Sequence, residues 1–155
     1  MNGNPLQISA TLLLVVAGAA LLMISACQRP QGEKGGTNGD PAFQNSYWKL
    51  VELGESGPVN DSGSAEAHLI FGGDSSVTGR TGCNHLSGKY ARNGDAIRFE
   101  PLITTKMACP DRMELEQRFL AALGATQRWK ISGGKLELYD GAGKMLARFE
   151  AREKM

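Results

Sequence analysis

Short runs of apolar and polar residues, separated by turn residues, recur along the chain from Tyr47 onward. The segment 96–100 alternates strictly, as expected for a strand with one buried face. The other runs are rich in β-branched and aromatic residues and end at Gly, Asn or Asp, which is typical of short strands. The pattern therefore predicts about eight strands, over 47–53, 67–71, 76–80, 86–92, 96–100, 128–132, 135–139 and 145–150.

Glycine-rich turns join most of the predicted strands into hairpins. Asn93-Gly94 is the strongest of these signals, because both residues tolerate the positive φ of a type I′ turn. The turns of the other predicted hairpins are Gly72-Gly73-Asp74, Gly133-Gly134 and Gly141-Ala142-Gly143. The chain holds 20 glycines, most of them at such turns, and this favours a β-rich fold.

Segment 111–123 is the one convincing helix after the N-terminal region. Its apolar residues recur at i, i+4, i+7 and i+8 and form one face: Leu115, Phe119, Ala122 and Leu123. Asp111 and Glu114 have the spacing of a capping box, and Gly124 suits the C′ position. Consecutive hairpins with one helix after the fifth strand predict a mainly β (α+β) fold. In it an antiparallel sheet curls into a barrel-like or sandwich form, and the helix covers an open side.

The N-terminal region is expected to be a lipoprotein signal peptide over residues 1–26. Residues 12–22 are apolar or small throughout, and Ile24-Ser25-Ala26-Cys27 resembles the bacterial lipobox, in which the cysteine is acylated before cleavage in front of it. Met1 to Ala10 lacks the usual Lys or Arg, and an ordinary cleaved signal with an incidental cysteine is the alternative. Segment 27–45 then comprises the lipidated Cys27 and a Gly- and Pro-rich flexible tether, and the globular domain spans 46–155.

Charge and length restrict the function classes. Lys plus Arg number 17 against 16 for Asp plus Glu, so the formal net charge is +1. This balance argues against a nucleic-acid binder, which usually carries a basic face. A length of 155 residues suits one domain.

Two stretches, 79–90 and 104–110, gather the residues with chemical potential. If Cys27 is lipidated, Cys83 and Cys109 remain as a pair in an oxidising compartment, which favours a disulfide over two buried thiols. The bridge would pin the glycine-rich stretch to the segment before the helix. Asn84 would then act as a turn or capping residue, while His85 is left without a role.

Two chemical alternatives involve the same residues. A cysteine hydrolase would use Cys83 and His85 with Asn84 and Ser87 nearby, but the thiol would have to stay reduced beside Cys109. A metal site would combine four residues, namely Cys83, His85, His68 and Cys109, yet no spacing such as C-x-x-C brings two ligands together. We expect neither catalysis nor a metal, and no cofactor.

The order of motifs resembles the META domain, also called the HslJ-like domain, from about Trp48 to Phe149. The resemblance rests on a set of residues: Gly82, Cys83, Asn84, Gly88, Tyr90, Thr105, Met107, Ala108, Cys109, Pro110, Glu116 and Phe119. It implies a compact β-rich fold with one helix, found in bacterial envelope lipoproteins that include heat-inducible and antibiotic-tolerance-linked members. It implies no established catalytic activity.

These observations together predict a non-catalytic envelope lipoprotein, anchored at Cys27, whose domain binds a protein or an envelope component. Gln28 rather than Asp follows the anchor, so the outer membrane is the expected destination in a cell with two membranes. The protein is expected to be a monomer. The alternative function is a carrier of a small apolar ligand in a pocket of the barrel, although eight-stranded barrels are usually filled by their own side chains.

Overall fold

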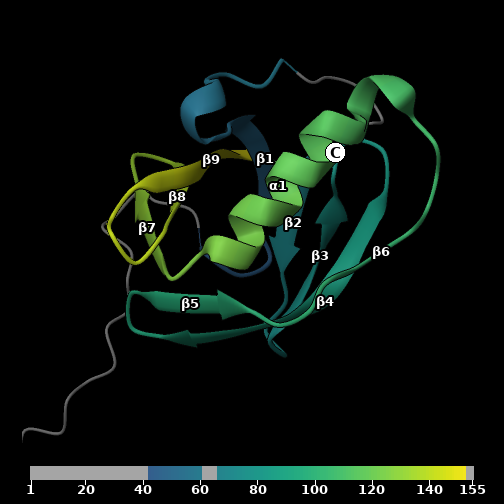
Figure 1. Ribbon diagram of the computed structural model, residues 1–155. Helices are drawn as coiled ribbons and strands as arrows, with labels where there is room; N and C mark the ends of the chain where they lie inside the picture. The colour runs from purple at the N-terminus through teal and green to yellow at the C-terminus, as the bar shows by residue number, and fades with distance from the viewer. Residues whose placement is uncertain (1–41, 61–65, 153–155) are drawn as a thin grey trace, which may run out of the picture. The chain divides into compact units, whose positions relative to one another are not determined.

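Nine strands pair into one antiparallel sheet that curls into a ring, with a single α-helix, in a computed structural model that describes residues 42–60 and 66–152 (Figure 1). The strands are β1 (Tyr47–Glu52), β2 (His68–Phe71), β3 (Ser76–Arg80), β4 (His85–Asn93), β5 (Ala96–Phe99), β6 (Ile103–Thr104), β7 (Arg128–Ser132), β8 (Lys135–Tyr139) and β9 (Met145–Arg152). The predicted mainly β fold with one helix is confirmed. Cys27 and segment 1–26 lie outside the described residues.

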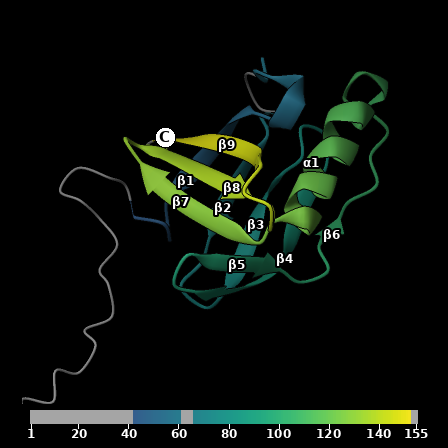
Figure 2. The same cartoon turned by 60° about the vertical axis from the view of Figure 1, so that its left-hand side comes forward.

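The sheet order is β3-β2-β1-β9-β8-β7-β5-β4-β6, and an additional pairing of β3 with β4 closes the ring. Strand β4 makes this closure possible because it is long: one edge pairs with β3, and the other pairs with β5 and β6. A single residue pair, Ala96 opposite Arg128, joins β5 to β7. Helix α1 (Met113–Ala125) packs against β5 and β9; it crosses in front of the sheet in Figure 1 and stands to one side of it in Figure 2.

The interior is filled by side chains from every part of the sheet and from the helix. The largest fully buried residues are Trp48, Leu50, Leu69, Phe71, Phe119, Leu123, Leu136, Leu138 and Phe149. The rings of Phe119 on α1 and Phe149 on β9 lie 5.9 Å apart and join helix to sheet. The apolar face predicted for the helix is confirmed at Phe119, Ala122 and Leu123, which are buried.

The two ends of the helix differ from the sequence-based prediction. A 3-10 turn, Pro110–Arg112, precedes α1, and neither element has a side-chain cap, so the expected capping box of Asp111 and Glu114 does not form. The helix also continues through Gly124 to Ala125. Its last turn is closed by Thr126, whose hydroxyl donates to the carbonyl of Ala122 at 2.8 Å.

The β4–β5 hairpin is present, with its turn displaced by one residue from the prediction. Asn93 pairs with Ala96 and ends β4, so the turn consists of Gly94 and Asp95, and only Gly94 (φ 59°) has positive φ. The β7–β8 hairpin turns through Gly133 and Gly134, both with positive φ, as predicted.

Phe43 and Gln44, which the sequence analysis assigned to the tether, pack onto the ring. The Phe43 ring stacks on the Phe71 ring, with centroids 4.2 Å apart. The backbone carbonyl of Phe43 accepts a hydrogen bond from the Trp48 indole at 3.0 Å. The guanidinium of Arg92 lies 4.9 Å from the ring centroids of both Phe43 and Trp129. The packed structure therefore includes the residues immediately before Ser46.

Among the residues that the structure describes, no helix combines the length and the apolar character needed to cross a bilayer.

Candidate functional site

The candidate stretch begins at a four-residue loop, 81–84, between β3 and β4. Arg80 and His85 are paired on either side of it. Inside the loop, the amide of Thr81 donates to the carbonyl of Asn84 at 2.9 Å, and Gly82 has φ 101°, where a side chain would be strained. This geometry places Cys83 and Asn84 in the interior, with 2% and 5% of their surfaces exposed.

The side chain of Asn84 connects three segments of the chain. Its Oδ1 accepts hydrogen bonds from the Thr105 hydroxyl at 2.8 Å and from the Met107 amide at 2.7 Å. Its Nδ2 donates to Oε2 of Glu116 on α1 at 2.7 Å and to the Met107 carbonyl at 3.4 Å. We refer to Asn84, Thr105, Met107 and Glu116 as the Asn84 latch. It ties the loop to the segment after β6 and to the helix.

A disulfide reinforces the latch. The sulfur atoms of Cys83 and Cys109 are 1.97 Å apart and the Cα atoms 6.0 Å apart. This is the pairing favoured by the sequence analysis. Since Cys109 directly precedes the 3-10 turn that leads into α1, the bridge and the Asn84 amide hold the same segment at two points.

The other motif residues also have structural contacts. Tyr90 is buried, and its hydroxyl donates to the Gly72 carbonyl at 3.0 Å and accepts from Nε2 of Gln44 at 2.8 Å. At Gly88 an added Cβ would lie 2.7 Å from a Leu102 methyl group. Pro110 opens the 3-10 turn, and Ala108 is exposed beside the bridge.

The hydrolase alternative is incompatible with this geometry. A nucleophilic cysteine must be a thiolate, whereas Cys83 is buried in a disulfide. His85 and Ser87 are exposed and lie on the side of β4 opposite to the buried Leu86. The nucleophile and its base are therefore not brought together.

The metal alternative finds no support in the part of the chain that the structure describes. Within residues 42–60 and 66–152, no three residues of the types His, Cys, Asp and Glu are grouped so that they could hold an ion. His68 and His85 lie on either side of Arg80, and both cysteines are oxidised.

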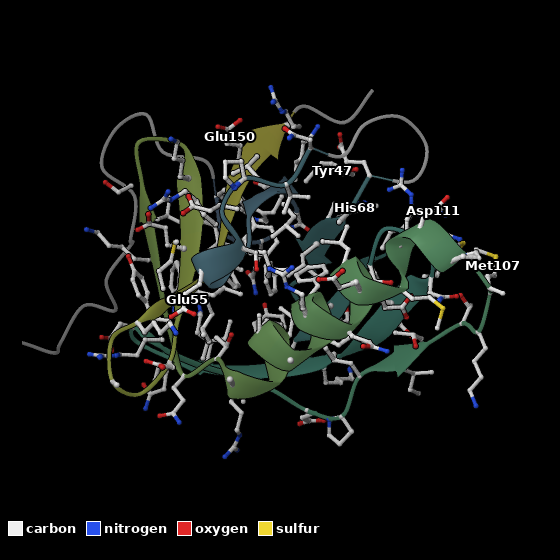
Figure 3. All side chains as sticks on the ribbon, turned by 45° about the horizontal axis from the view of Figure 1, so that its top comes forward. Tyr47, Glu55, His68, Met107, Asp111 and Glu150 are labelled. Carbon is white, nitrogen blue, oxygen red and sulfur yellow. A yellow bond between two sulfur atoms is a disulfide. The ribbon has the colours of Figure 1, made fainter. Side chains whose placement is uncertain are left out.

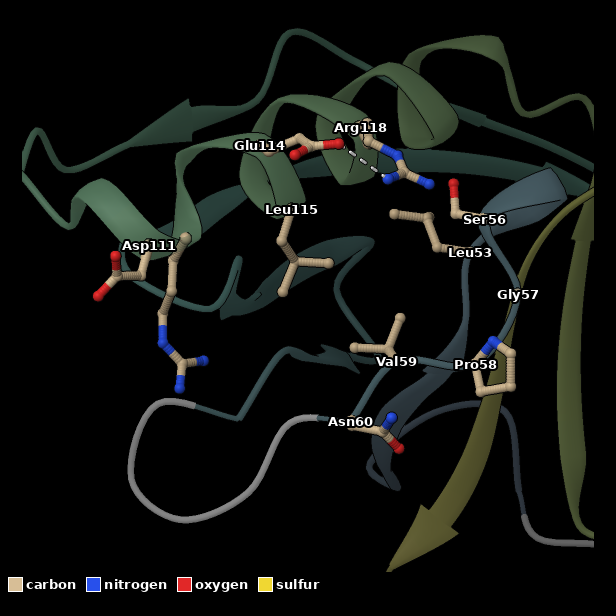
Figure 4. A pocket seen from close by; sticks show the side chains of 11 residues that line it. Leu53, Ser56, Gly57, Pro58, Val59, Asn60, Asp111, Glu114, Leu115 and Arg118 are labelled. Carbon is tan, nitrogen blue, oxygen red and sulfur yellow. Dashed lines mark hydrogen bonds and ion pairs between the residues drawn. The ribbon is translucent and has the colours of Figure 1, made fainter.

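A surface pocket of about 480 Å³ lies between segment 53–60 and the start of α1 (Figure 4). The side chains of Leu53, Val59 and Leu115 point toward one another at its apolar floor. Glu114 and Arg118 form an ion pair at its rim, with an N–O distance of 3.2 Å. Nothing in the sequence analysis indicated this pocket, because its lining comes from a loop and a helix end that are far apart in the chain.

The hydrogen bond that Glu116 accepts from Asn84 was also not predicted from the sequence. The sequence analysis named Glu116 only as part of the motif, since a carboxylate on a helix gives no local sign that an amide 32 residues earlier will donate to it. In the structure Glu116 is half-buried, which the sequence alone did not indicate.

Comparison with known proteins gives a family and a fold. The family model described as META domain matches residues 41–153. No curated protein matches the chain at a significant level.

Three solved structures share the fold with the chain at 20% sequence identity or less. An NMR structure of a protein from Burkholderia xenovorans is 20% identical, with a TM-score of 0.58 over 81% of this chain and 98% of that one. A second NMR structure, also 20% identical, has a TM-score of 0.56 over 69% of this chain and 90% of the other. The crystal structure of a DUF4847 family protein from Bacteroides vulgatus is 15% identical, with a TM-score of 0.53 over 73% and 96% of the two chains.

Proposed function

The chain belongs to the META domain family, and we propose that it is a non-catalytic, lipid-anchored protein of the bacterial cell envelope whose domain binds a protein or another envelope component. The observation that carries this proposal is the use of the motif residues. Cys83 is in a disulfide, and Asn84 makes its hydrogen bonds to Thr105, Met107 and Glu116. Cys83 and Asn84 of the family motif therefore make structural contacts, and this supports a non-catalytic role.

The anchor is supported by the sequence. The apolar run 12–22 is followed by Ile24-Ser25-Ala26-Cys27, and a Gly- and Pro-rich segment separates Cys27 from Phe43, the first buried residue that the structure describes. Acyl chains on the cysteine sulfur and on its amine would give the multiple-chain attachment that stable anchoring needs. A disulfide suits the same oxidising, extracytoplasmic location.

Binding and not catalysis is the role we assign to the domain, with no cofactor and with a monomeric state. Outer-membrane residence follows from Gln28 if the cell has two membranes. A contribution to stress or antibiotic tolerance is the physiological context that the family resemblance suggests.

The alternative role, carriage of a small apolar ligand inside the ring, is less well supported. Such a carrier needs an apolar cavity of several hundred Å³. The described interior is instead filled by residues such as Trp48, Phe71 and Phe149, all fully buried, and the 480 Å³ pocket has a charged rim at the surface.

The anchor is tested with Cys27→Ala and with Ser25→Ala as a matched control that keeps a small residue in the lipobox. We expect Cys27→Ala to abolish incorporation of labelled palmitate and to move the protein out of the membrane fraction, while Ser25→Ala retains both. Membrane retention of Cys27→Ala without acylation would contradict the proposal.

Photo-crosslinking from exposed positions in intact membranes would then identify the partner, and the absence of any specific adduct would count against a binding role.

A further inference from the structure

Three basic residues lie side by side across the outer side of the sheet. His68 on β2 is opposite Arg80 on β3, and Arg80 is opposite His85 on β4. Directly opposed residues of antiparallel strands project to the same side. The strand neighbours Leu69, Gly79 and Leu86 are buried, so the three basic side chains project outward. We refer to His68, Arg80 and His85 as the outer basic row.

The same line of paired residues is balanced in charge on the far side of His68. There Lys49 on β1 is opposite His68, its ammonium lies 2.5 Å from the Glu66 carboxylate, and Glu150 on β9 is opposite Lys49. By contrast, β2, β3 and β4 contain no Asp or Glu within their bounds. Like charges directly opposite one another in a sheet are destabilising, so a bound anion would relieve the repulsion from Arg80 when the two histidines are protonated.

His68 is held in a defined orientation. Its ring stacks on Tyr47, with centroids 4.3 Å apart, and its Nδ1 is 2.9 Å from the Glu66 carbonyl (Figure 3). A carbonyl only accepts hydrogen bonds, so Nδ1 carries the hydrogen and Nε2 is the nitrogen that gains a proton. Burial lowers the pKa of His68 below its ordinary value. Glu66 opposes this shift through its carbonyl and its carboxylate, and the charges of Arg80 and His85 add to it.

Arg80 and His85 each have one part that is hydrogen-bonded to the chain and one part that is not. Nη2 of Arg80 donates to the Cys83 carbonyl at 3.1 Å, and its buried Nε has no hydrogen-bond partner among the described residues. The backbone of His85 is paired with Thr105 in both directions, each at 3.1 Å, while its exposed ring makes no hydrogen bond to the described part of the chain. A planar guanidinium with histidines on either side suits the oxygens of a phosphate group.

We propose that the outer basic row binds the phosphate group of an envelope component, either a lipid headgroup or a free phosphate compound, and that binding strengthens as the pH falls. The histidines become donors and gain charge when protonated, so the anion and the protons bind together. Other ionisable groups on the neighbouring elements are Lys49 and Tyr47 on β1, Glu66 before β2, and Glu150, which is opposite Lys49 on β9. Glu66 is already engaged by Lys49 and Tyr47, so it does not neutralise Arg80. A phosphate ligand would specify the binding role proposed above. Only the lipid headgroup, as one of its two sources, depends on the proposed lipid anchor.

Histidine NMR tests the site directly, because the chain contains two histidines and both belong to the row. The purified full-length protein in a neutral detergent is titrated with acid, with and without inorganic phosphate, at constant ionic strength set by chloride. Near saturation we expect the titration midpoint of His68 to rise by about one pH unit, the effect of a close opposite charge. The lipid arm uses vesicles of phosphatidylcholine with or without phosphatidic acid. A response to free phosphate indicates a soluble ligand, and a response to phosphatidic acid alone indicates a headgroup.

Two variants and a control assign the response. Arg80→Gln and His85→Gln should each reduce the phosphate-dependent shift of the His68 midpoint at least threefold. His85→Gln is the stricter test of phosphate binding, because the exposed ring of His85 makes no contact on which folding depends. Lys130→Gln removes an exposed cation from β7 and should leave the shift unchanged. Midpoints that ignore both phosphate and phosphatidic acid, an equal shift with chloride alone, or an equal loss in Lys130→Gln would each overturn the proposal. None of these results depends on acylation of Cys27, so they are separable from the fractionation test.

Discussion

Asn84 and His85 are neighbours in the chain, yet the end of the 81–84 loop places them on opposite sides of the sheet. Asn84 is buried, and both ends of its amide are hydrogen-bonded within the latch. His85 is exposed, and its ring has no hydrogen bond to the described residues. Arg80 connects the two regions, because it belongs to the outer basic row but donates to the carbonyl of Cys83. The difference shows that a motif rich in Cys, Asn and His can serve stability on one side of the sheet and place a basic side chain on the other.

The largest effect is expected from breaking the latch at its centre. Asn84→Ala would leave the Met107 amide and the half-buried carboxylate of Glu116 without their partly buried hydrogen bonds to Asn84. Each unsatisfied group costs about 1–3 kcal/mol, so we expect the free energy of unfolding to fall by roughly 4 kcal/mol. Urea denaturation of the purified protein measures this. Asn93→Ala, at the exposed end of β4, is the matched control and should change stability by less than about 0.5 kcal/mol.

Removing the disulfide should have the next largest effect. The bridge joins residues 26 apart in sequence, and closing a loop of that size is worth about 3 kcal/mol in chain entropy. The variant Cys83→Ala with Cys109→Ala should therefore lose a comparable free energy of unfolding. Dithiothreitol should destabilise the native protein and have no effect on this variant. Equal sensitivity of both to the reductant would mean that the bridge does not hold the latch.

The outer basic row should affect stability weakly and only in acid. The pKa of His68 is lowered by burial, so the unfolded chain binds a proton more readily than the folded one. Stability from this residue is complete above about pH 6.5, the ordinary histidine value, and falls as the pH drops below it. His68→Gln should lose that part of the pH dependence in denaturation curves between pH 7.5 and 5.5. If the stability of His68→Gln depended on pH as that of the native protein does, burial of the His68 ring would not disfavour its protonated form.

The smallest change in stability is expected at the residue next to Asn84. His85→Ala removes an exposed side chain and keeps both backbone hydrogen bonds to Thr105, so the free energy of unfolding should stay within about 0.5 kcal/mol. The same denaturation series as for Asn84→Ala provides the measurement. A loss as large as that of Asn84→Ala would remove the distinction between the two sides of the sheet.

The fold was predictable to a large extent because its signals are local. Alternation in 96–100 and the paired glycines at Gly133 and Gly134 gave β5 and the β7–β8 hairpin, and the apolar spacing around Phe119 gave the helix. The helix ends were mispredicted, because Thr126 closes the last turn through its hydroxyl and Gly124 keeps a helical conformation.

The site was predictable only in part, because its contacts are long-range. The pairing of the two cysteines followed from their number once Cys27 was set aside. The bond from Asn84 to Glu116 spans 32 residues, and the alignment of His68, Arg80 and His85 depends on the registers of three strands. Neither has a local pattern. The packing of Phe43 was missed for a related reason, since an isolated aromatic residue in a polar segment does not show where its ring will be buried.

A double-mutant cycle between Asn84 and Glu116 tests the central claim, that the motif is a structural latch, most directly. The free energies of unfolding of Asn84→Ala, Glu116→Ala and the double variant are compared with that of the native protein. We predict a coupling energy of about 1–3 kcal/mol, because the two side chains share a partly buried hydrogen bond of 2.7 Å. Additive single effects, together with a stability of Asn84→Ala within about 0.5 kcal/mol of the native protein, would contradict the account.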